Sequence, residues 1–163
     1  MGINFVKQWI QAGMNDLSKL YTVFTVDGVS LPALKDTALG VIATQTWSPD
    51  LDNAMNQKFV FDYKAKHGGY PSFYAAQAYD TMMAIDYAIG EAGSADTEAM
   101  RAVLASGNIP TTRGVLQMNS NQFPIQNVYL REVVLDSDGV ATTKIIDTVF
   151  EDHGDAYAKD CKF

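Results

Sequence analysis

The first 47 residues alternate between helical and strand-like segments, and this alternation most constrains the fold. Apolar residues recur at helical spacing over 4–14, whereas 21–26 (YTVFTV) has the β-branched and aromatic composition of a strand. A short helix is predicted over 31–39 and a second strand over 41–47. This order of helix, strand, helix and strand predicts an α/β fold in which helices cover a parallel sheet.

The rest of the chain has a different pattern. Its middle is predicted to form helices over 53–66, 72–92 and 96–105. Its last third is predicted to form strands over 114–118, 128–135 and 141–150. The turn residues Asp-Ser-Asp-Gly at 136–139 predict a hairpin between the last two strands, and a polar, poorly ordered tail is expected from 151 onward.

Charge and motif content exclude several functional classes. With 12 Lys and Arg against 19 Asp and Glu, the net charge is −7, and no basic cluster suited to nucleic acid is present. No apolar run approaches the roughly 18–20 residues that span a bilayer. Phosphate-binding, dinucleotide-binding and nucleophile-elbow motifs are lacking, so no cofactor is predicted.

Metal and disulfide chemistry are also not indicated. The histidines, His67 and His153, do not lie at the spacing of a zinc site. The single cysteine, Cys161, cannot form a disulfide within this chain, although a partner on another segment stays possible. We therefore predict no metal site and no catalytic residues.

Three residues are candidates for contact with a small molecule. Asp27 follows a predicted parallel strand, where ligands of open α/β sheets bind, although Asp-Gly is also a common turn. Tyr74 lies in the first turn of the longest predicted helix, and Trp47 ends a strand. Either aromatic residue can contact a ligand or pack in the core.

Longer stretches of the sequence resemble a known family. The segment N-x-x-F-V-x-x-Y starting at Asn56 and the segment P-S-x-x-A-x-x-A-Y-D starting at Pro71 carry the most specific likeness, and it extends over residues 3–150. The chain resembles the C-terminal half of the periplasmic solute-binding proteins of ABC transporters, of the branched-chain amino-acid (Leu/Ile/Val-binding) type.

The resemblance implies part of a two-lobed type I clamshell, an α/β fold of parallel sheets flanked by helices. Residues 1–47 and 127–150 would belong to the second lobe, 48–126 to a mainly helical part of the first lobe, and 151–163 to a C-terminal tail. It also implies a periplasmic location, a membrane permease as partner, and an N-terminal half that is missing from this sequence.

The same resemblance implies roles for two of the candidates. Asp27 matches an acidic position that meets the ligand's ammonium group, and Tyr74 matches an aromatic position on the other lobe. The implied function is binding of an amino acid or a related small aromatic or aliphatic carboxylate by hinge closure, without catalysis. Two alternatives stay open: a ligand-sensing receptor domain on the same scaffold, and an open α/β enzyme that uses Asp27.

Overall fold

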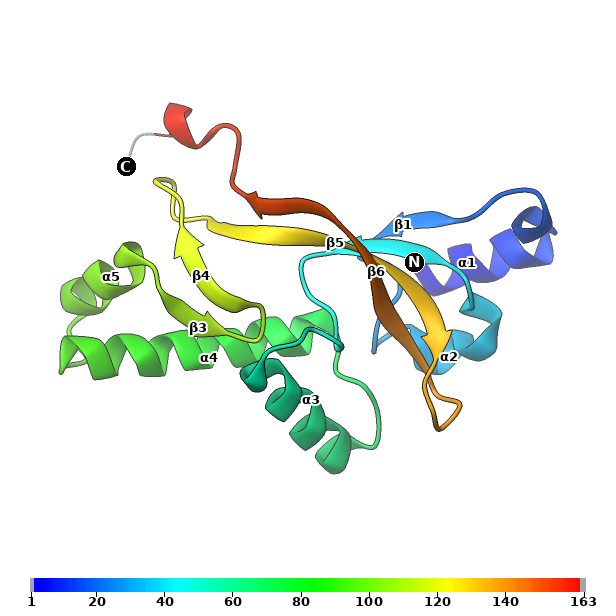
Figure 1. Ribbon diagram of the computed structural model, residues 1–163, viewed down its shortest axis with the longest axis horizontal. Coiled ribbons are helices and arrows are strands. Elements are labelled where there is room, and N and C mark those ends of the chain that lie inside the picture. Colours follow the sequence, from blue (N-terminus) through cyan, green and yellow to red (C-terminus); the bar gives the residue numbers. More distant parts are fainter. Residues whose placement is uncertain (1, 162–163) are drawn as a thin grey trace.

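Two long antiparallel strands, β5 (Pro124–Leu135) and β6 (Ala141–His153), pair with each other and connect the two ends of the molecule (Figure 1). The structure is a computed structural model that describes residues 2–161. One end of the strand pair carries a small sheet with two covering helices. The other end carries three helices and a hairpin. These two ends are called the sheet unit and the helical unit below.

The sheet unit consists of four elements and the adjoining part of β5. They are α1 (Gly2–Gln11), β1 (Tyr21–Val23), α2 (Leu31–Leu34) and β2 (Ile42–Gln45). Strand β1 pairs with β2 in parallel, as expected from the alternation of helix and strand. However, β2 pairs with β5 antiparallel, so the predicted parallel sheet is corrected to a mixed one.

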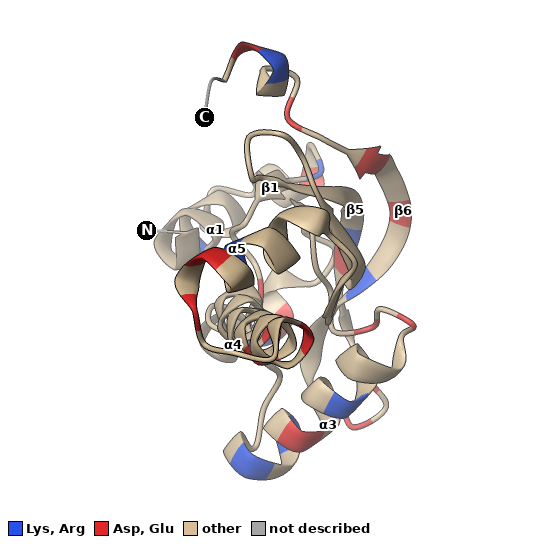
Figure 2. Ribbon diagram, turned by 90° about the vertical axis from the view of Figure 1, so that its left-hand side faces the viewer, with Lys and Arg blue, Asp and Glu red and all other residues tan. Residues whose placement is uncertain are grey.

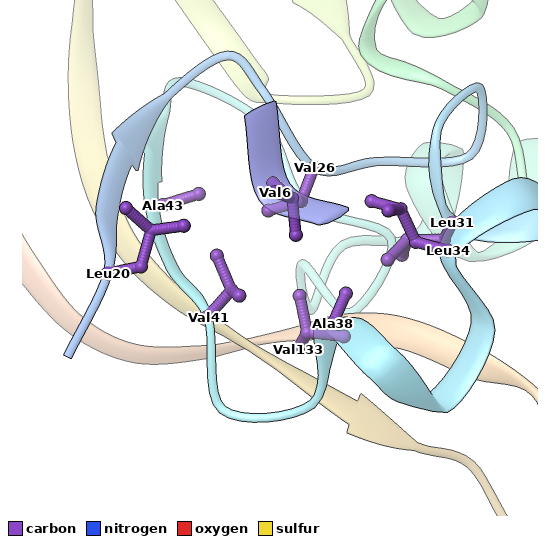
Figure 3. Packing of buried hydrophobic residues seen from close by; sticks show 9 residues of the cluster. All are labelled: Val6, Leu20, Val26, Leu31, Leu34, Ala38, Val41, Ala43 and Val133. Atoms are coloured by element: carbon purple, nitrogen blue, oxygen red, sulfur yellow. The ribbon is translucent and has the colours of Figure 1, made fainter. Parts of the chain in front are cut away.

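Small and branched apolar side chains form the core of the sheet unit (Figure 3). Val6 of α1 and Val26 after β1 have no exposed surface, and Val133 connects β5 to the same cluster. The core is completed by Leu20, Leu31, Leu34, Ala38, Val41 and Ala43. Burial of these residues fixes the loop between β1 and α2, which carries Asp27.

The helical unit contains three helices and a short hairpin. The elements are α3 (Ala54–His67), α4 (Phe73–Ala92), α5 (Thr97–Ser106), β3 (Ile109–Thr111) and β4 (Gly114–Met118). Each helix has a side-chain N-cap: Asn53 on α3, Ser72 on α4 and Asp96 on α5. Strand β4 pairs with the start of β5, and this pairing joins the unit to the long strands.

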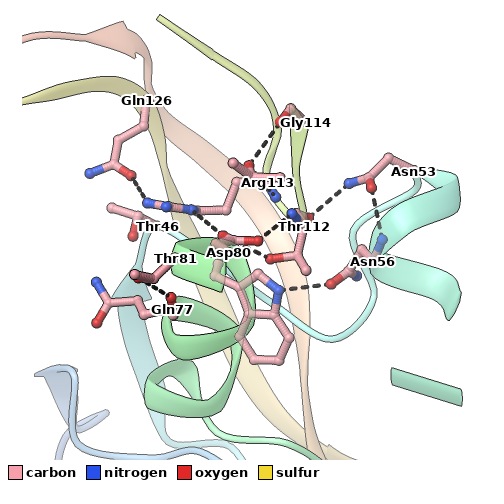
Figure 4. Close-up of polar contacts among 12 residues, drawn as sticks. Thr46, Asn53, Asn56, Gln77, Asp80, Thr81, Thr112, Arg113, Gly114 and Gln126 are labelled. Carbon is pink, nitrogen blue, oxygen red and sulfur yellow. Dashed lines mark hydrogen bonds and ion pairs between the residues drawn. The ribbon is translucent and has the colours of Figure 1, made fainter. Parts of the chain in front are cut away.

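A buried polar cluster holds α4 against the turn between β3 and β4 (Figure 4). Asp80, which is 4% exposed, accepts hydrogen bonds from the Thr112 N–H at 2.6 Å and from the Thr112 hydroxyl at 3.1 Å. It also pairs with Nε of Arg113 at 3.1 Å, and Arg113 reaches Gln126 in β5. The orientation of α4 thus depends on one buried carboxylate.

Differences from the sequence-based elements have local causes. The strand predicted over 21–26 ends at Val23, because Phe24 has a φ of +53°, which interrupts an extended backbone. The helix predicted over 31–39 divides into α2 and a 3₁₀ turn over Lys35–Ala38. Strand β3 was not predicted, and β6 continues to His153, into the expected tail.

Replacing Gly90 by alanine is expected to raise the free energy of unfolding by about 0.5–1 kcal/mol. Gly90 lies within α4, and a Cβ added there meets no atom within 4 Å. Urea unfolding followed by circular dichroism tests this. Gly93→Ala is the control and should destabilise instead, because Gly93 has a φ of +64°. An unchanged midpoint for Gly90→Ala would show that this turn of α4 is frayed.

Candidate ligand-binding site

The loop between β1 and α2 forms a tight turn around Asp27. The Val29 N–H donates to Asp27 Oδ1 at 2.9 Å, and the Asp27 N–H donates to the Ser30 hydroxyl at 3.0 Å. The Leu31 N–H donates to the Asp27 carbonyl at 2.9 Å, which starts α2. These hydrogen bonds explain the Asp-Gly pair as turn chemistry, and they leave the second carboxylate oxygen facing out of the turn.

That second oxygen reaches the first residue of α4. Asp27 Oδ2 accepts from the Phe73 N–H at 3.2 Å, and Asp27 is 9% exposed. Beside it, Gly28 packs directly against the backbone of Tyr70 and Pro71. A carboxylate at the N-terminus of a helix is favoured by the partial positive charge there. Asp27 therefore joins the sheet unit to the helical unit.

Three aromatic rings surround this junction. Phe24, just after β1, packs on Phe73 with ring centroids 5.2 Å apart, and Phe73 contacts Tyr74 at 5.7 Å. Phe73 is buried, whereas Phe24 is 49% exposed and Tyr74 is 65% exposed. The junction thus presents two accessible aromatic faces next to a carboxylate, a combination suited to a small ligand with an apolar part.

A buried arginine lies near the carboxylate. Arg131 of β5 has no exposed surface, and it donates to the Val26 carbonyl at 3.4 Å and to the Thr143 hydroxyl at 3.0 Å. Burial lowers the pKa of its guanidinium to about 10, and the charges of Asp27 and Asp50 partly oppose this.

Trp47 lies away from any accessible surface. It is 1% exposed, its indole N–H donates to Asn56 Oδ1 at 2.7 Å, and its ring packs edge-on against Phe59. Asn56 also donates to the carbonyls of Ser48, Pro49 and Leu51. Of the two interpretations of Trp47, the structure shows core packing. A ligand contact at Trp47 stays a prediction.

A second contact joins the two units at the β5–β6 hairpin. The Tyr70 hydroxyl donates to Asp136 at 2.8 Å, and Lys64 of α3 lies 3.6 Å from the same carboxylate and 4.1 Å from the Tyr70 ring centre. Hydrogen bonds, first from the Val140 N–H and then from Tyr70, lower the pKa of Asp136. Residues 70–73 are thereby held at both ends against the sheet unit.

The sequence identified Asp27 and Tyr74 as candidates for the site. It did not identify Phe24, Tyr70 and Arg131, which also lie at or near the junction. Phe24 looked like a strand residue, and only its φ of +53° turns it toward α4. Arg131 lies in a strand-like segment, where a single charged residue usually points to solvent. No signal in the sequence identified Tyr70. The structure brings Asp27 close to the start of α4, with Tyr74 one residue beyond its partner Phe73.

The described residues at the junction offer hydrogen bonding and apolar contact. Among residues 2–161, no group of three or more His, Cys, Asp or Glu is placed to hold a metal ion. Within the same range, no helix has the length and apolar character needed to cross a membrane.

Comparison with known proteins gives a consistent result. The family model described as "Periplasmic binding protein" matches residues 1–139. The Leu/Ile/Val-binding protein homolog 6 of Brucella abortus is 37% identical over 130 residues, which is 77% of this chain and 33% of the relative. The chain thus spans about a third of the length of the curated relatives it matches.

Solved structures of the same architecture are similar over nearly the whole chain. A solute-binding protein of an ABC transporter from Rhodopseudomonas palustris, in complex with 3,4-dihydroxybenzoic acid, has a TM-score of 0.82 at 28% identity, covering 95% of this chain and 43% of that one. An ABC transporter substrate-binding protein from Sphaerobacter thermophilus also has a TM-score of 0.82, at 24% identity, covering 93% and 42%. A leucine-binding protein from Thermotoga maritima has 0.68, at 23% identity, covering 88% and 40%.

Proposed function

Because the chain belongs to the periplasmic binding protein family, we propose that it is part of the solute-binding component of an ABC importer. It acts outside the cytoplasm, binds a small molecule and presents it to a membrane permease. The fold is that of the type I binding proteins, as the similarity over 93–95% of the chain shows. The delivered ligand and the permease are parts of the proposal, since the chain covers 42–43% of those neighbours.

The observation that carries this proposal is the junction at Asp27. One carboxylate from the sheet unit meets the N-terminus of α4 from the helical unit, and the exposed faces of Phe24 and Tyr74 lie beside it. A site where two units meet, with one charged group and apolar walls, suits a ligand that stabilises their closure. Hinge closure is the mechanism that we propose.

The proposed lobes follow the strand pairing. Residues 1–47 and 127–150 form part of one lobe and 48–126 part of the other, with 151–163 as a tail. Strand β5 supports this division, because its start pairs with β4, and from Tyr129 onward it pairs with β2. Two strands that pass from one unit to the other are suitable hinge elements.

We propose an amino acid or a related small carboxylate as the ligand. Asp27 supports an ammonium group, since a carboxylate can accept further hydrogen bonds beyond those from Val29 and Phe73. The aromatic faces support an apolar or aromatic side chain. Among the similar structures, one is a leucine-binding protein, and others are complexes with benzoate and 3,4-dihydroxybenzoic acid.

The test is titration calorimetry with leucine and benzoate as probes. The sample for this titration is a fusion protein. In it, the part of the Brucella relative that this chain does not match is placed before residue 1. The 163-residue chain alone is measured in parallel. We expect micromolar binding by the fusion and much weaker binding by the chain alone, because that chain supplies only part of the ligand's surroundings. If the fusion binds neither probe and no other amino or aromatic acid, the proposal is contradicted.

Replacing Asp27 by alanine is expected to change the affinities for leucine and for benzoate by different amounts. Loss of a charge-assisted partner costs about 2–5 kcal/mol, so leucine affinity should fall at least tenfold, whereas benzoate, which has no ammonium group, should be affected less. Glu91→Ala, an exposed change near the end of α4, is the matched control. Leucine binding that is unchanged in Asp27→Ala would remove Asp27 from the site.

A further inference from the structure

Three side chains meet between the two units at a point that shares no group with the junction at Asp27. Helix α3 carries charges of both signs along its ribbon (Figure 2), and Lys64 lies in its last turn. Tyr70 lies in the connection from α3 to α4, and Asp136 directly follows β5. Lys64, Tyr70 and Asp136 are called the Tyr70 cluster below. The cluster joins the helical unit to the sheet unit by a polar contact.

The acceptor in this cluster is held in position by its own turn. Asp136 Oδ1 accepts from the Asp138 N–H at 3.0 Å and from the Val140 N–H at 2.8 Å. Asp136 Oδ2 is left for the Tyr70 hydroxyl at 2.8 Å, and the Lys64 ammonium lies 3.6 Å from the same oxygen. Because the hairpin turn already orients the carboxylate, pairing with Tyr70 costs little further ordering of that side chain.

The donor and the acceptor both have the protonation state that the contact needs. Burial and the hydrogen bond to Asp136 raise the pKa of Tyr70, so its hydroxyl stays protonated and donates. A hydrogen bond to a carboxylate is stronger than one between neutral groups. The side chain of Asp136 is only 13% exposed, so solvent and salt screen this contact less than a pair on the open surface.

Cavities border the Tyr70 cluster on two sides. One, of about 510 Å³, is lined by residues that include Lys35 and Gly139, and the other, of about 570 Å³, by residues that include Phe61 and Lys144. Tyr70 lines both cavities, so it stands between them. A polar contact between two hollows can open and close without the repacking that separation of a close-packed core requires.

We propose that Lys64, Tyr70 and Asp136 are positioning residues for ligand binding, which hold the two units together from outside the ligand site and set the affinity for every ligand by a common factor. A ligand that binds the closed arrangement binds more weakly when that arrangement is less populated, whatever the chemistry of the ligand. A residue inside the site, such as Asp27, instead changes the affinity for each ligand by a different amount. This inference rests on the proposed function for hinge closure around a ligand.

The first test is hydrogen exchange of the 163-residue chain, with Tyr70→Phe as the variant. This change removes only the hydroxyl that donates to Asp136. We expect exchange of the Phe73 amide to become at least about threefold faster, because its acceptor Asp27 belongs to the other unit and is lost when the units separate. Tyr63→Phe is the matched control, since it removes a hydroxyl from α3 that makes no hydrogen bond with residues 2–161, and it should leave exchange unchanged.

The second test is titration of the fusion protein with leucine and benzoate. Tyr70→Phe is expected to weaken both by the same factor, at least about threefold. Lys64→Met should act in the same direction, whereas Lys64→Arg, which keeps the positive charge, should retain the affinity. Circular dichroism establishes that the variants fold, and the comparison of Lys64→Met with Lys64→Arg replaces Tyr70→Phe if that variant does not.

Three results would overturn this inference. They are exchange at Phe73 that is equal in Tyr70→Phe and Tyr63→Phe, faster exchange with unchanged affinities, and a loss of affinity for only one of the two ligands. The last would place Tyr70 in contact with the ligand. Failure of the proposed function gives a different result: the fusion then binds neither probe, while exchange of the chain alone still reports whether the Tyr70 cluster holds the units together.

Discussion

Replacing Asp80 by alanine is expected to lower the free energy of unfolding by about 3–5 kcal/mol, the usual cost of removing one partner from a buried ion pair. The carboxylate is 4% exposed and accepts three hydrogen bonds from the turn between β3 and β4. Without it, the Arg113 guanidinium stays in a poorly solvated position, where its side chain is 11% exposed. The Thr112 N–H also loses its acceptor, which adds to the cost.

Urea unfolding monitored by circular dichroism measures this change. Asp86→Ala is the matched control, since it removes the same group from an exposed position on the same helix, and such surface changes usually stay within about 0.5 kcal/mol. The double variant Asp80→Ala/Arg113→Met should recover part of the loss, because it removes the unpaired charge. Equal midpoints for Asp80→Ala and Asp86→Ala would show that the cluster in Figure 4 does not stabilise the fold.

Elements set by local sequence were predicted well. The helices α3, α4 and α5 each have an N-cap side chain and a glycine after the last turn, so their bounds followed from residues close in the chain. The parallel pairing of β1 with β2 followed from the helix between them. The hairpin at 136–139 followed from its turn residues.

Features that depend on distant residues were not predicted. Strand β5 pairs antiparallel with β2, a contact between residues 84–90 positions apart that periodicity does not encode, so the sheet was expected to be parallel throughout and is mixed. The Asp27 carboxylate meets an N–H 46 residues away. Sequence identified the carboxylate at the end of a strand, but its partner in α4 and the exposed ring of Phe24 required the fold.

Replacing Gly28 by alanine is expected to separate the two sides of the proposed ligand site. A Cβ at this position would lie 2.6 Å from the Pro71 carbonyl oxygen and 2.7 Å from its carbon, and it would also strike the Tyr70 carbonyl. These are backbone atoms, so no side-chain rotation relieves the contact. Gly28 does not have a positive φ, so the expected effect comes from the collision and not from backbone strain.

The most sensitive reporter of this separation is the Phe73 amide. Phe73 begins α4, where an N–H has no acceptor within its own helix, so its protection depends on Asp27 Oδ2. We expect hydrogen exchange at Phe73 to become at least tenfold faster in Gly28→Ala, together with a loss of about 1–3 kcal/mol of stability, as for other overpacked sites. Leucine affinity of the fusion protein should fall at least tenfold in the same variant.

Gly69→Ala is the control, because a Cβ there meets no atom within 4 Å and the residue lies in the same connection before α4. It should leave both the exchange rate and the affinity unchanged. If Gly28→Ala destabilises the chain but leaves Phe73 protected, the loop and α4 move together, and Asp27 is a structural cap on α4. If exchange and affinity change together, the contact between Gly28 and residues 70–71 controls closure of the ligand site, since Gly28 itself has no side chain to offer a ligand.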